Sequence, residues 1–378
     1  MKKITVAMTA LAAAGALALA GCGGGDDTTT APPSDGDNTQ QPDDGDATEG
    51  EGFAADATIG ISLPQKTSQN WVEAEEMFLA GLSEAGYNPI VQFANNGASE
   101  QQQQIESMIE QGAKVIVIGA VDGSQLSSQV ERARDAGVKI IAYDRMIQET
   151  DAVDLYVAYD NFQVGVGQGE ALLKGLAERK GDGPWNIELI AGSNDDANSK
   201  PFFEGAMSIL QPKIDDGTLK VLSGQTTQAQ VATEGWQASV AQNRMDSIIS
   251  GFYGSEELHG VLSPNDTLAR AAIASAQAAG KDLPVLTGQD SEDDSVASVA
   301  KGEQYHTIFK DTRGLVDAVL AQIDLAQQGQ PFNSNAEVDN GTIQVPTDFL
   351  TPISVFQDNA AEVYANDEAR AKIVADNS

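Results

Sequence analysis

The sequence predicts an α/β protein made of two doubly wound lobes. Short apolar runs of strand length alternate with longer segments whose apolar residues recur at helical spacing, as in parallel βα repeats. This alternation begins near residue 57 and starts again after Asp160-Asn161. The portion from residue 57 onward has about 320 residues, more than a typical single domain holds. We therefore expect two similar sheets with a cleft between them.

The first half of this portion supplies a regular series of strands and helices. Strands are expected over 57–62, 89–93, 114–118 and 138–142, and helices over 71–85, 99–111 and 124–136. Helix 71–85 carries Ala74, Phe78 and Leu82 on one face, and Gly86 ends it. The run 114–118 is apolar after its first residue, which is typical of an interior parallel strand.

The second half repeats the pattern. Strands are expected over 187–190, 219–222, 260–262, 284–286 and 305–309, with helices between them, for example over 267–279 and 312–328. Right-handed crossovers would place these helices on the faces of a parallel sheet.

Four apolar runs end abruptly in hydrogen-bonding residues. They are IIAYDR, VLSPND, VLTGQD and TIFKDT, and they place Asp144, Arg145, Asn265, Asp290 and Lys310 at strand ends. Ligands of open α/β sheets bind outside the carboxyl ends of the strands. The set mixes two carboxylates, one amide and two cations. That balance favours a neutral polyhydroxylated ligand over an anion, which would attract mainly cations.

The N-terminus is typical of an export signal. Lys2 and Lys3 precede an apolar stretch over 6–20, shorter than the roughly 20 residues that span a membrane. The stretch ends in Leu-Ala-Gly-Cys, which resembles the bacterial lipoprotein box, whose cysteine is lipidated. We therefore expect a signal peptide over 1–21 and an anchor at Cys22 on the outer face of the cytoplasmic membrane. Cys22 is the only cysteine, so no intrachain disulfide can form.

The segment after Cys22 is strongly acidic. Residues 23–56 contain ten acidic residues and no basic one, with almost nothing apolar. Such a segment cannot bury a core, so 22–56 is expected to be a lipidated and disordered tether. The whole chain carries a formal charge of −34, which excludes nucleic-acid binding because phosphate contacts need clustered cations.

Several weaker signals lead to no chemistry. The glycines of Gly165–Gly169 only partly match a dinucleotide fingerprint and favour close helix packing instead. His259 and His306 are the only histidines, so neither a metal site nor a cofactor is expected. Asp144 and Asp290 could form a hydrolase pair, but neighbouring donors favour binding over acid–base work.

Longer strings identify a family. QKTSQNWVEA, GVKIIAYDRMI, YDNFQVGVGQ, GSNDDAN, TGQD, GEQYHTIFKDTRG and VPTDFLTPI lie between about residues 58 and 356. With them the chain resembles the periplasmic sugar-binding proteins of ABC importers, in the xylose-binding and multiple-monosaccharide branch. The resemblance implies the type I periplasmic-binding-protein fold, with two Rossmann-like lobes and three crossovers in the hinge. It places the N-terminal lobe at 57–161 plus 308–340 and the C-terminal lobe at 162–307 plus 341–378.

The resemblance also implies roles for individual residues. The strand-end residues named above match family residues that hydrogen-bond sugar hydroxyls, and Asn198 matches an asparagine near the ring oxygen. Trp71 and Trp236 align with aromatic residues that would sandwich a pyranose. Lys66 matches a lysine near the cleft mouth. Asn70 stands where relatives often carry a basic residue, which leaves sugar specificity open. Phe202 and Phe203 either close the cleft or fill the core.

The expected function is therefore binding without catalysis. The protein would capture an aldose such as xylose, glucose, galactose or arabinose as a monomer and deliver it to the membrane subunits of an ABC permease by hinge closure. One alternative is a sensor whose sugar-bound form docks on a histidine kinase or chemoreceptor. Another is a secreted glycosidase, which would release reducing sugar from a glycoside.

Overall fold

The computed structural model describes residues 52–378 except 67 and 96, and these lie in one compact unit. The expected signal peptide, Cys22 and most of the expected tether lie outside the described residues. Within the described part, we find no helix with the length and apolar character needed to cross a bilayer.

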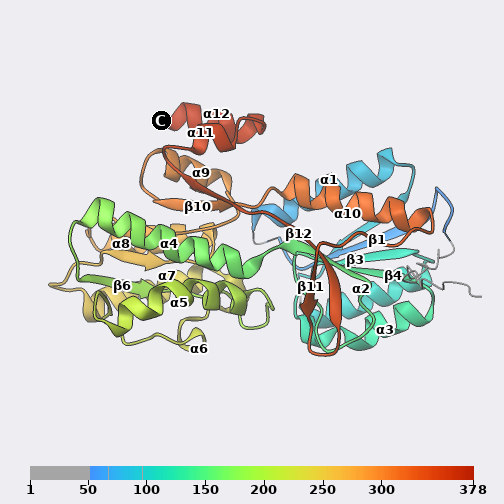
Figure 1. The fold of residues 1–378 in the computed structure, drawn as a ribbon, viewed down its shortest axis with the longest axis horizontal. Helices are drawn as coiled ribbons and strands as arrows, with labels where there is room; N and C mark the ends of the chain where they lie inside the picture. Colours follow the sequence, from blue (N-terminus) through green and yellow to red (C-terminus); the bar gives the residue numbers. More distant parts are fainter. Residues whose placement is uncertain (1–51, 67, 96) are drawn as a thin grey trace, which may run out of the picture. The chain divides into compact units, whose positions relative to one another are not determined.

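The first lobe is built on a seven-stranded sheet (Figure 1). Its order is β11 (Ala336–Asp339), β12 (Gln344–Leu350), β5 (Leu155–Tyr159), β4 (Lys139–Tyr143), β3 (Val115–Ile118), β1 (Thr58–Leu63) and β2 (Asn88–Phe93). All neighbours run parallel except β11 and β12. Strands β2-β1-β3-β4-β5 thus follow a common doubly wound order, whose ligand site lies at the β1/β3 switch point.

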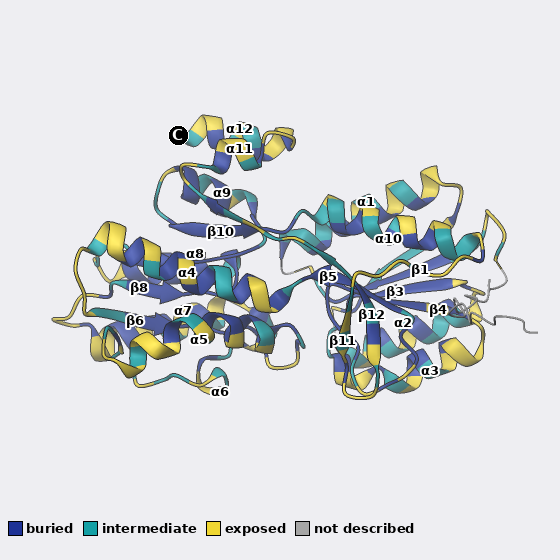
Figure 2. Ribbon diagram, viewed as in Figure 1, coloured by how far each residue is buried: buried dark blue, intermediate teal, exposed yellow. Residues whose placement is uncertain are grey.

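Helices cover both faces of this sheet (Figures 1 and 2). The face of Val115 and Val117 packs against α1 (Gln69–Glu84) and α10 (Thr312–Gln327). The face of Ile116 and Ile118 packs against α2 (Ala98–Glu110) and α3 (Ser127–Asp135), with a 3₁₀ turn, η1 (Gly123–Gln125), before α3. Because alternate strand residues point to opposite faces, the all-apolar run serves both cores.

The second lobe repeats the same strand order. Its four-stranded parallel sheet runs β7 (Leu219–Val221), β6 (Trp185–Leu189), β8 (Gly260–Leu262) and β9 (Val285–Leu286). One face packs against α4 (Asn161–Lys180) and α5 (Ser199–Asp215), and the other against α7 (Ala238–Phe252) and α8 (Asp266–Ala278). Two short helical turns, α6 (Gln228–Val231) and η2 (Glu234–Trp236), precede α7.

The lobe is completed by a two-stranded antiparallel pair, β10 (His306–Phe309) and β13 (Ile353–Phe356). Helices α9 (Asp293–Ala300), α11 (Ala360–Val363) and α12 (Glu368–Asn377) pack with it around a small core of their own. These helices lie beside β10 in Figure 1.

Glycines bring α4 and α5 into close contact. A Cβ at Gly165 would lie 2.1 Å from the carbonyl oxygen of Phe202, and one at Gly205 would lie 2.1 Å from that of Phe162. Real Cβ atoms do not approach a backbone so closely, so both positions require glycine. The glycine run of α4 therefore serves helix packing, as the incomplete fingerprint indicated.

The described chain passes between the lobes three times, after β5, β10 and β12. Two limits expected from the sequence need correction. Strand β10 belongs to the second lobe because it pairs with β13, so the expected limit at 308 moves to about 310. Strand β12 belongs to the first lobe because it pairs with β5, so the expected limit at 340 moves beyond Leu350.

Candidate ligand-binding site

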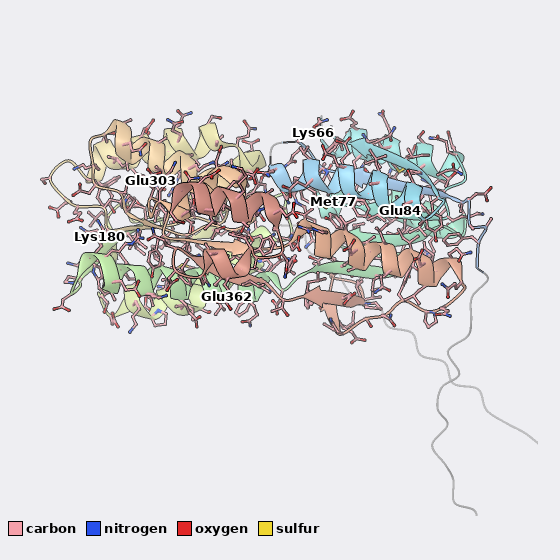
Figure 3. All side chains as sticks on the ribbon, turned by 90° about the horizontal axis from the view of Figure 1, so that it is seen from above. Lys66, Met77, Glu84, Lys180, Glu303 and Glu362 are labelled. Carbon is pink, nitrogen blue, oxygen red and sulfur yellow. The ribbon has the colours of Figure 1, made fainter. Side chains whose placement is uncertain are left out.

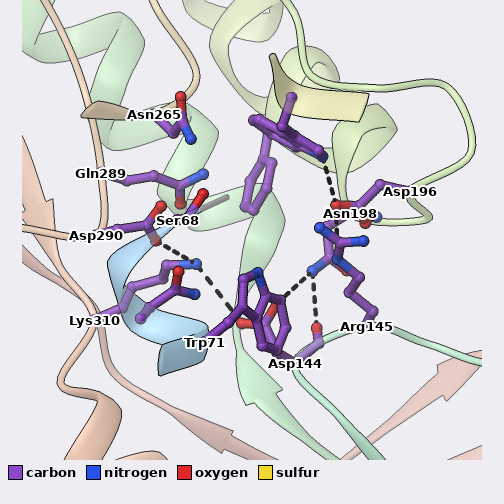
Figure 4. Close-up of a pocket in the computed structure, with 13 residues that line it drawn as sticks. Ser68, Trp71, Asp144, Arg145, Asp196, Asn198, Asn265, Gln289, Asp290 and Lys310 are labelled. Atoms are coloured by element: carbon purple, nitrogen blue, oxygen red, sulfur yellow. Dashed lines mark hydrogen bonds and ion pairs between the residues drawn. The ribbon is translucent and has the colours of Figure 1, made fainter. Parts of the chain in front are cut away.

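A pocket between the lobes collects side chains from the carboxyl ends of both parallel sheets (Figure 4). The space between its side chains is about 330 Å³, which includes space open to solvent. Its lining residues are Ser68, Asn70, Trp71, Asp144, Arg145, Asp196, Asn198, Phe202, Trp236, Asn265, Gln289, Asp290 and Lys310. The carboxyl ends of the strands thus bring residues that are far apart in the sequence to one place.

Lys310 bridges two carboxylates at the base of the pocket. Its Nζ lies 3.1 Å from Asp290 Oδ1 and 3.7 Å from Asp144 Oδ2, and the three side chains are at most 11% exposed. Burial alone would lower the pKa of the Lys310 ammonium, but Asp290 and Asp144 raise it above the ordinary lysine value. The ammonium therefore stays charged, and the trio presents one donor group between two acceptor groups.

Asp196 links a residue of the first lobe to the wall of the second. Its Oδ2 lies 3.0 Å from Arg145 Nε and accepts a 3.0 Å hydrogen bond from Trp236 Nε1. Its Oδ1 accepts a bond of 2.9 Å from the backbone N–H of Asn198. Burial raises the pKa of Asp196, while Arg145 opposes that shift. The carboxylate therefore fixes both the guanidinium and the indole.

Two tryptophans supply apolar walls. Trp71, on the first turn of α1, lies edge-on to Tyr143 at 6.0 Å, and the Arg145 guanidinium lies 5.2 Å from its ring. Trp236 lies edge-on to Phe202 at 6.5 Å. A Cβ at Gly192 would lie 2.2 Å from the Trp236 ring, so the indole occupies space that only glycine leaves. Aromatic faces of this kind suit the C–H surface of a ring-shaped polar ligand.

Three buried polar atoms of the pocket lack a hydrogen-bond partner among the described residues. They are Asn70 Oδ1, Gln289 Oε1 and Arg145 Nε. The Arg145 Nε–H is near Asp196 but is not directed at it, so their contact is an ion pair without a well-formed hydrogen bond at that atom. An unmade bond at a buried polar atom costs roughly 1–3 kcal/mol. Acceptors and a donor together are what a hydroxyl-rich ligand can satisfy.

The two asparagines of the second lobe also have structural roles. Asn198 Nδ2 donates to the carbonyl oxygen of Asp144 at 2.8 Å and to its Oδ1 at 3.3 Å, across the lobes. Asn265 Oδ1 accepts from the Leu268 N–H at 3.0 Å and so caps α8. The amide nitrogen of Asn265 is then the group available to a ligand.

Backbone strain gathers at the pocket. Asp144, Trp236 and Asp290 have φ values of 61°, 56° and 89°. Residues other than glycine seldom adopt this left-handed region, and such strain is concentrated at functional sites.

The structure places one expected ligand residue, Lys66, outside the pocket lining and decides between the two alternatives left open for Phe202 and Phe203. Lys66 does not line the pocket: its Nζ pairs with Glu75 at 2.7 Å and lies 4.3 Å from the Phe93 ring, at the surface near the start of α1 (Figure 3). Phe203 is buried in the second-lobe core, whereas Phe202 lines the pocket.

Sequence reasoning missed three lining residues. Gln289 directly precedes Asp290, and Asp196 stands two residues before Asn198 in the same string, so each lies beside a predicted residue. Ser68 belongs to the polar run before Trp71. Their adjacency was a usable signal, but which side chain of a loop faces inward depends on the local turn.

The described residues contain no group of three or more His, Cys, Asp or Glu side chains arranged to hold a metal ion.

The chain is similar in sequence to a known protein family and to sugar-binding proteins within it. A family model described as a periplasmic binding protein domain matches residues 59–331. The multiple sugar-binding periplasmic receptor ChvE of Rhizobium radiobacter is 41% identical over 319 residues, which cover 82% of this chain and 90% of that protein. The D-xylose-binding periplasmic protein of Escherichia coli is 30% identical over 315 residues, covering 83% and 91%.

Solved structures agree with these relatives. An ABC transporter solute binding protein from Clostridium phytofermentans with bound β-D-glucose has a TM-score of 0.79 and 34% identity, covering 83% of this chain and 99% of that one. A carbohydrate transporter solute binding protein from Chloroflexus aurantiacus in complex with D-glucose has a TM-score of 0.76 and 32% identity, covering 82% and 96%. The predicted family and fold are confirmed.

Proposed function

We propose that this protein is a monosaccharide receptor of an ABC importer, because the chain belongs to the periplasmic binding protein domain family. The names of its relatives describe sugar-binding receptors and solute binding proteins, not enzymes. The proposal extends their sugar ligands to the pocket of this chain.

The observation that carries the proposal is the combination of two buried tryptophans with polar groups that still need partners. Trp71 and Trp236 offer apolar faces, while Asn70, Gln289 and Arg145 hold unpaired buried atoms. A sugar ring has an apolar C–H face and hydroxyls that both donate and accept, so it meets both needs. Asp144, Asp290 and Lys310 would add charge-assisted bonds to its hydroxyls.

Ligand capture would proceed by hinge closure. The pocket is lined by both lobes, and three crossovers connect them, so rotation about these segments would open and close it. The closed form would be the one presented to the permease.

The protein is proposed to work while anchored to the membrane. The lipobox-like Leu-Ala-Gly-Cys ending at Cys22 supports lipidation, and the acidic segment after it supports a tether that holds the lobes away from the surface. Mass spectrometry of protein from membranes would show diacylglycerol on Cys22. A free Cys22 thiol, or an intact signal segment, would contradict the anchor.

Thermal melting tests the sugar assignment. The protein would be melted with a panel of pentoses, hexoses, inositol and furanoses. A ligand at 100 times its dissociation constant adds roughly 2.7 kcal/mol of stability, and Asp144→Asn is expected to remove most of that shift while staying folded. A flat panel with folded protein would contradict sugar binding, and an unchanged shift in Asp144→Asn would contradict the site.

A further inference from the structure

The lobes are also joined outside the pocket, by charged side chains of α1 and α12. Arg370 Nη2, on α12 of the second lobe, donates to Glu73 Oε1 and Oε2 of the first lobe at 3.1 and 3.3 Å. We propose that this pair is a latch that stabilises the closed arrangement of the lobes and thereby raises the affinity for a ligand that it does not touch. The inference rests on the proposed receptor function.

Arg370 is held ready for this contact by its own lobe. Its Nη1 donates to Asp367 Oδ2 at 2.9 Å, and its Nε donates to the Ser291 carbonyl at 2.8 Å. Its side chain is only 10% exposed, and that of Glu73 is 21% exposed. A guanidinium fixed in this way loses little further freedom when it meets the carboxylate, and the two bonds make the contact directional.

A second contact runs beside the first. Gln69 lies one turn before Glu73 on α1, and its Nε2 donates to Glu73 Oε1 at 2.7 Å. Gln69 Oε1 accepts from the backbone N–H of Asp293, at the start of α9 in the second lobe, at 3.0 Å. Asn70 and Trp71, which line the pocket, lie between Gln69 and Glu73. The first turn of α1 therefore has two contact surfaces. One lines the pocket, and the other contacts the second lobe.

The latch is suited to repeated opening. If the lobes separate, Arg370 keeps Asp367 and Ser291, and Glu73 keeps Gln69. Neither charge is left buried and alone, so release avoids the large cost of an isolated buried ion. A further interlobe pair, Arg313 to Asp367 at 3.5 Å, is 47% exposed on the arginine side and adds little.

The contribution of the latch can be measured with D-glucose and D-xylose as probes. Glu73→Gln removes the charge and keeps the shape, and Glu73→Lys places a cation opposite Arg370. We expect the dissociation constant to rise about threefold in the first variant and about tenfold in the second, the latter being about 1.4 kcal/mol. The rise should come from faster release, because the latch forms only after the ligand has entered.

Matched controls come from a pair that stays inside the first lobe. Glu106 on α2 contacts Arg132 on α3, so Glu106→Gln and Glu106→Lys change the same charges without an interlobe contact. Dissociation constants equal to wild type in both Glu106 variants, with the graded rise in the Glu73 variants, support the latch. Equal affinity of Glu73→Lys and wild type overturns it.

A second readout separates failure of the latch from failure of the receptor function. Spin labels at Glu110 of α2 and Asp246 of α7, with Cys22 replaced by serine, report the interlobe distance. If wild type binds neither D-glucose nor D-xylose, the receptor proposal is contradicted for these two sugars. The interlobe distances measured with the spin labels then still test the latch. A shift to longer distances in Glu73→Lys then supports it, and superimposable distributions overturn it.

Discussion

Removal of the Lys310 ammonium would test how strongly this cation stabilises the two buried carboxylates of the pocket. Lys310→Met keeps the length and apolar stem of the side chain but leaves Asp290 and Asp144 facing each other without a cation. At an effective dielectric constant of about 20, separations of 3.1 and 3.7 Å each correspond to about 5 kcal/mol of attraction. Desolvation of the three buried groups offsets much of this sum. The net loss expected on breaking a buried pair is about 3–5 kcal/mol of unfolding free energy.

The effect of Lys310→Met should depend on pH in a defined direction. The raised pKa of Lys310 means that its stabilising contribution is fully present below the ordinary lysine range and is lost only as pH rises above it. Wild type therefore gains or loses nothing from Lys310 between pH 5 and 8. In the variant, a carboxyl takes up a proton in place of the ammonium as pH falls. The stability gap to wild type should narrow from pH 7.5 to pH 5.

Urea unfolding at both pH values measures this gap, with Lys301→Met as the control because Lys301 is an exposed lysine at the end of α9. The control should match wild type within about 0.5 kcal/mol. A Lys310→Met gap below about 1 kcal/mol, or one that is the same at pH 5 and pH 7.5, would refute the reasoning. Either result would mean that the two carboxylates do not depend on the ammonium.

Three other predictions concern the pocket wall formed by Trp236, the buried side chain of His306 and the close contact between α4 and α5. Trp236→Ala should weaken D-glucose binding more than tenfold in calorimetry, while Trp185→Ala, outside the pocket lining, should not; equal losses would contradict an apolar wall. Burial lowers the pKa of His306 to about 3, so its stabilising contribution is present above pH 6.5 and is lost as pH falls. Between pH 6.5 and 4.5, the unfolding free energy of wild type measured in urea should fall by roughly 2 kcal/mol more than that of His306→Asn. Parallel curves would show that the imidazole is not the cause. Gly165→Ala should destabilise by about 1–3 kcal/mol, because its Cβ would meet the backbone of α5. Gly251→Ala, with open space at the new Cβ, should be neutral or stabilising in the same melts, and equal destabilisation would contradict the close contact.

The strand-end rule predicted five of the thirteen lining residues, Asp144, Arg145, Asn265, Asp290 and Lys310, because a parallel sheet fixes where its strands end. Asn70, Trp71, Asn198, Phe202 and Trp236 were expected only from the family resemblance. Asp144 directly follows β4 and Lys310 directly follows β10, so their positions could be predicted without knowledge of the turns. Lys66 follows a strand less closely, and its side chain turns to Glu75 on the same lobe instead. Loop length alone does not explain the difference, because Asp290 reaches the pocket four residues after β9 ends. In both loops the local turn, which the sequence does not specify, decides which side chain faces inward.

The third crossover was misplaced for a similar reason. Strand β12 contains Pro346 and Asp348 and lacks a clear apolar alternation, so the sequence gives little sign of a strand. Pro346 stands opposite Glu337 on β11, and Asp348 accepts hydrogen bonds from Gln322 and Asn335. Tertiary partners thus complete a strand whose own residues do not predict it.

The interleaved order of the lobes has a consequence for synthesis and export. The first lobe obtains part of its core from α10, through Leu315, Val316, Val319 and Ile323, and one strand of its sheet from β12. Both segments leave the ribosome after the whole parallel sheet of the second lobe. A growing chain therefore cannot complete the folding of its first lobe early. We expect it to stay unfolded enough to pass through a membrane channel until translation is nearly complete.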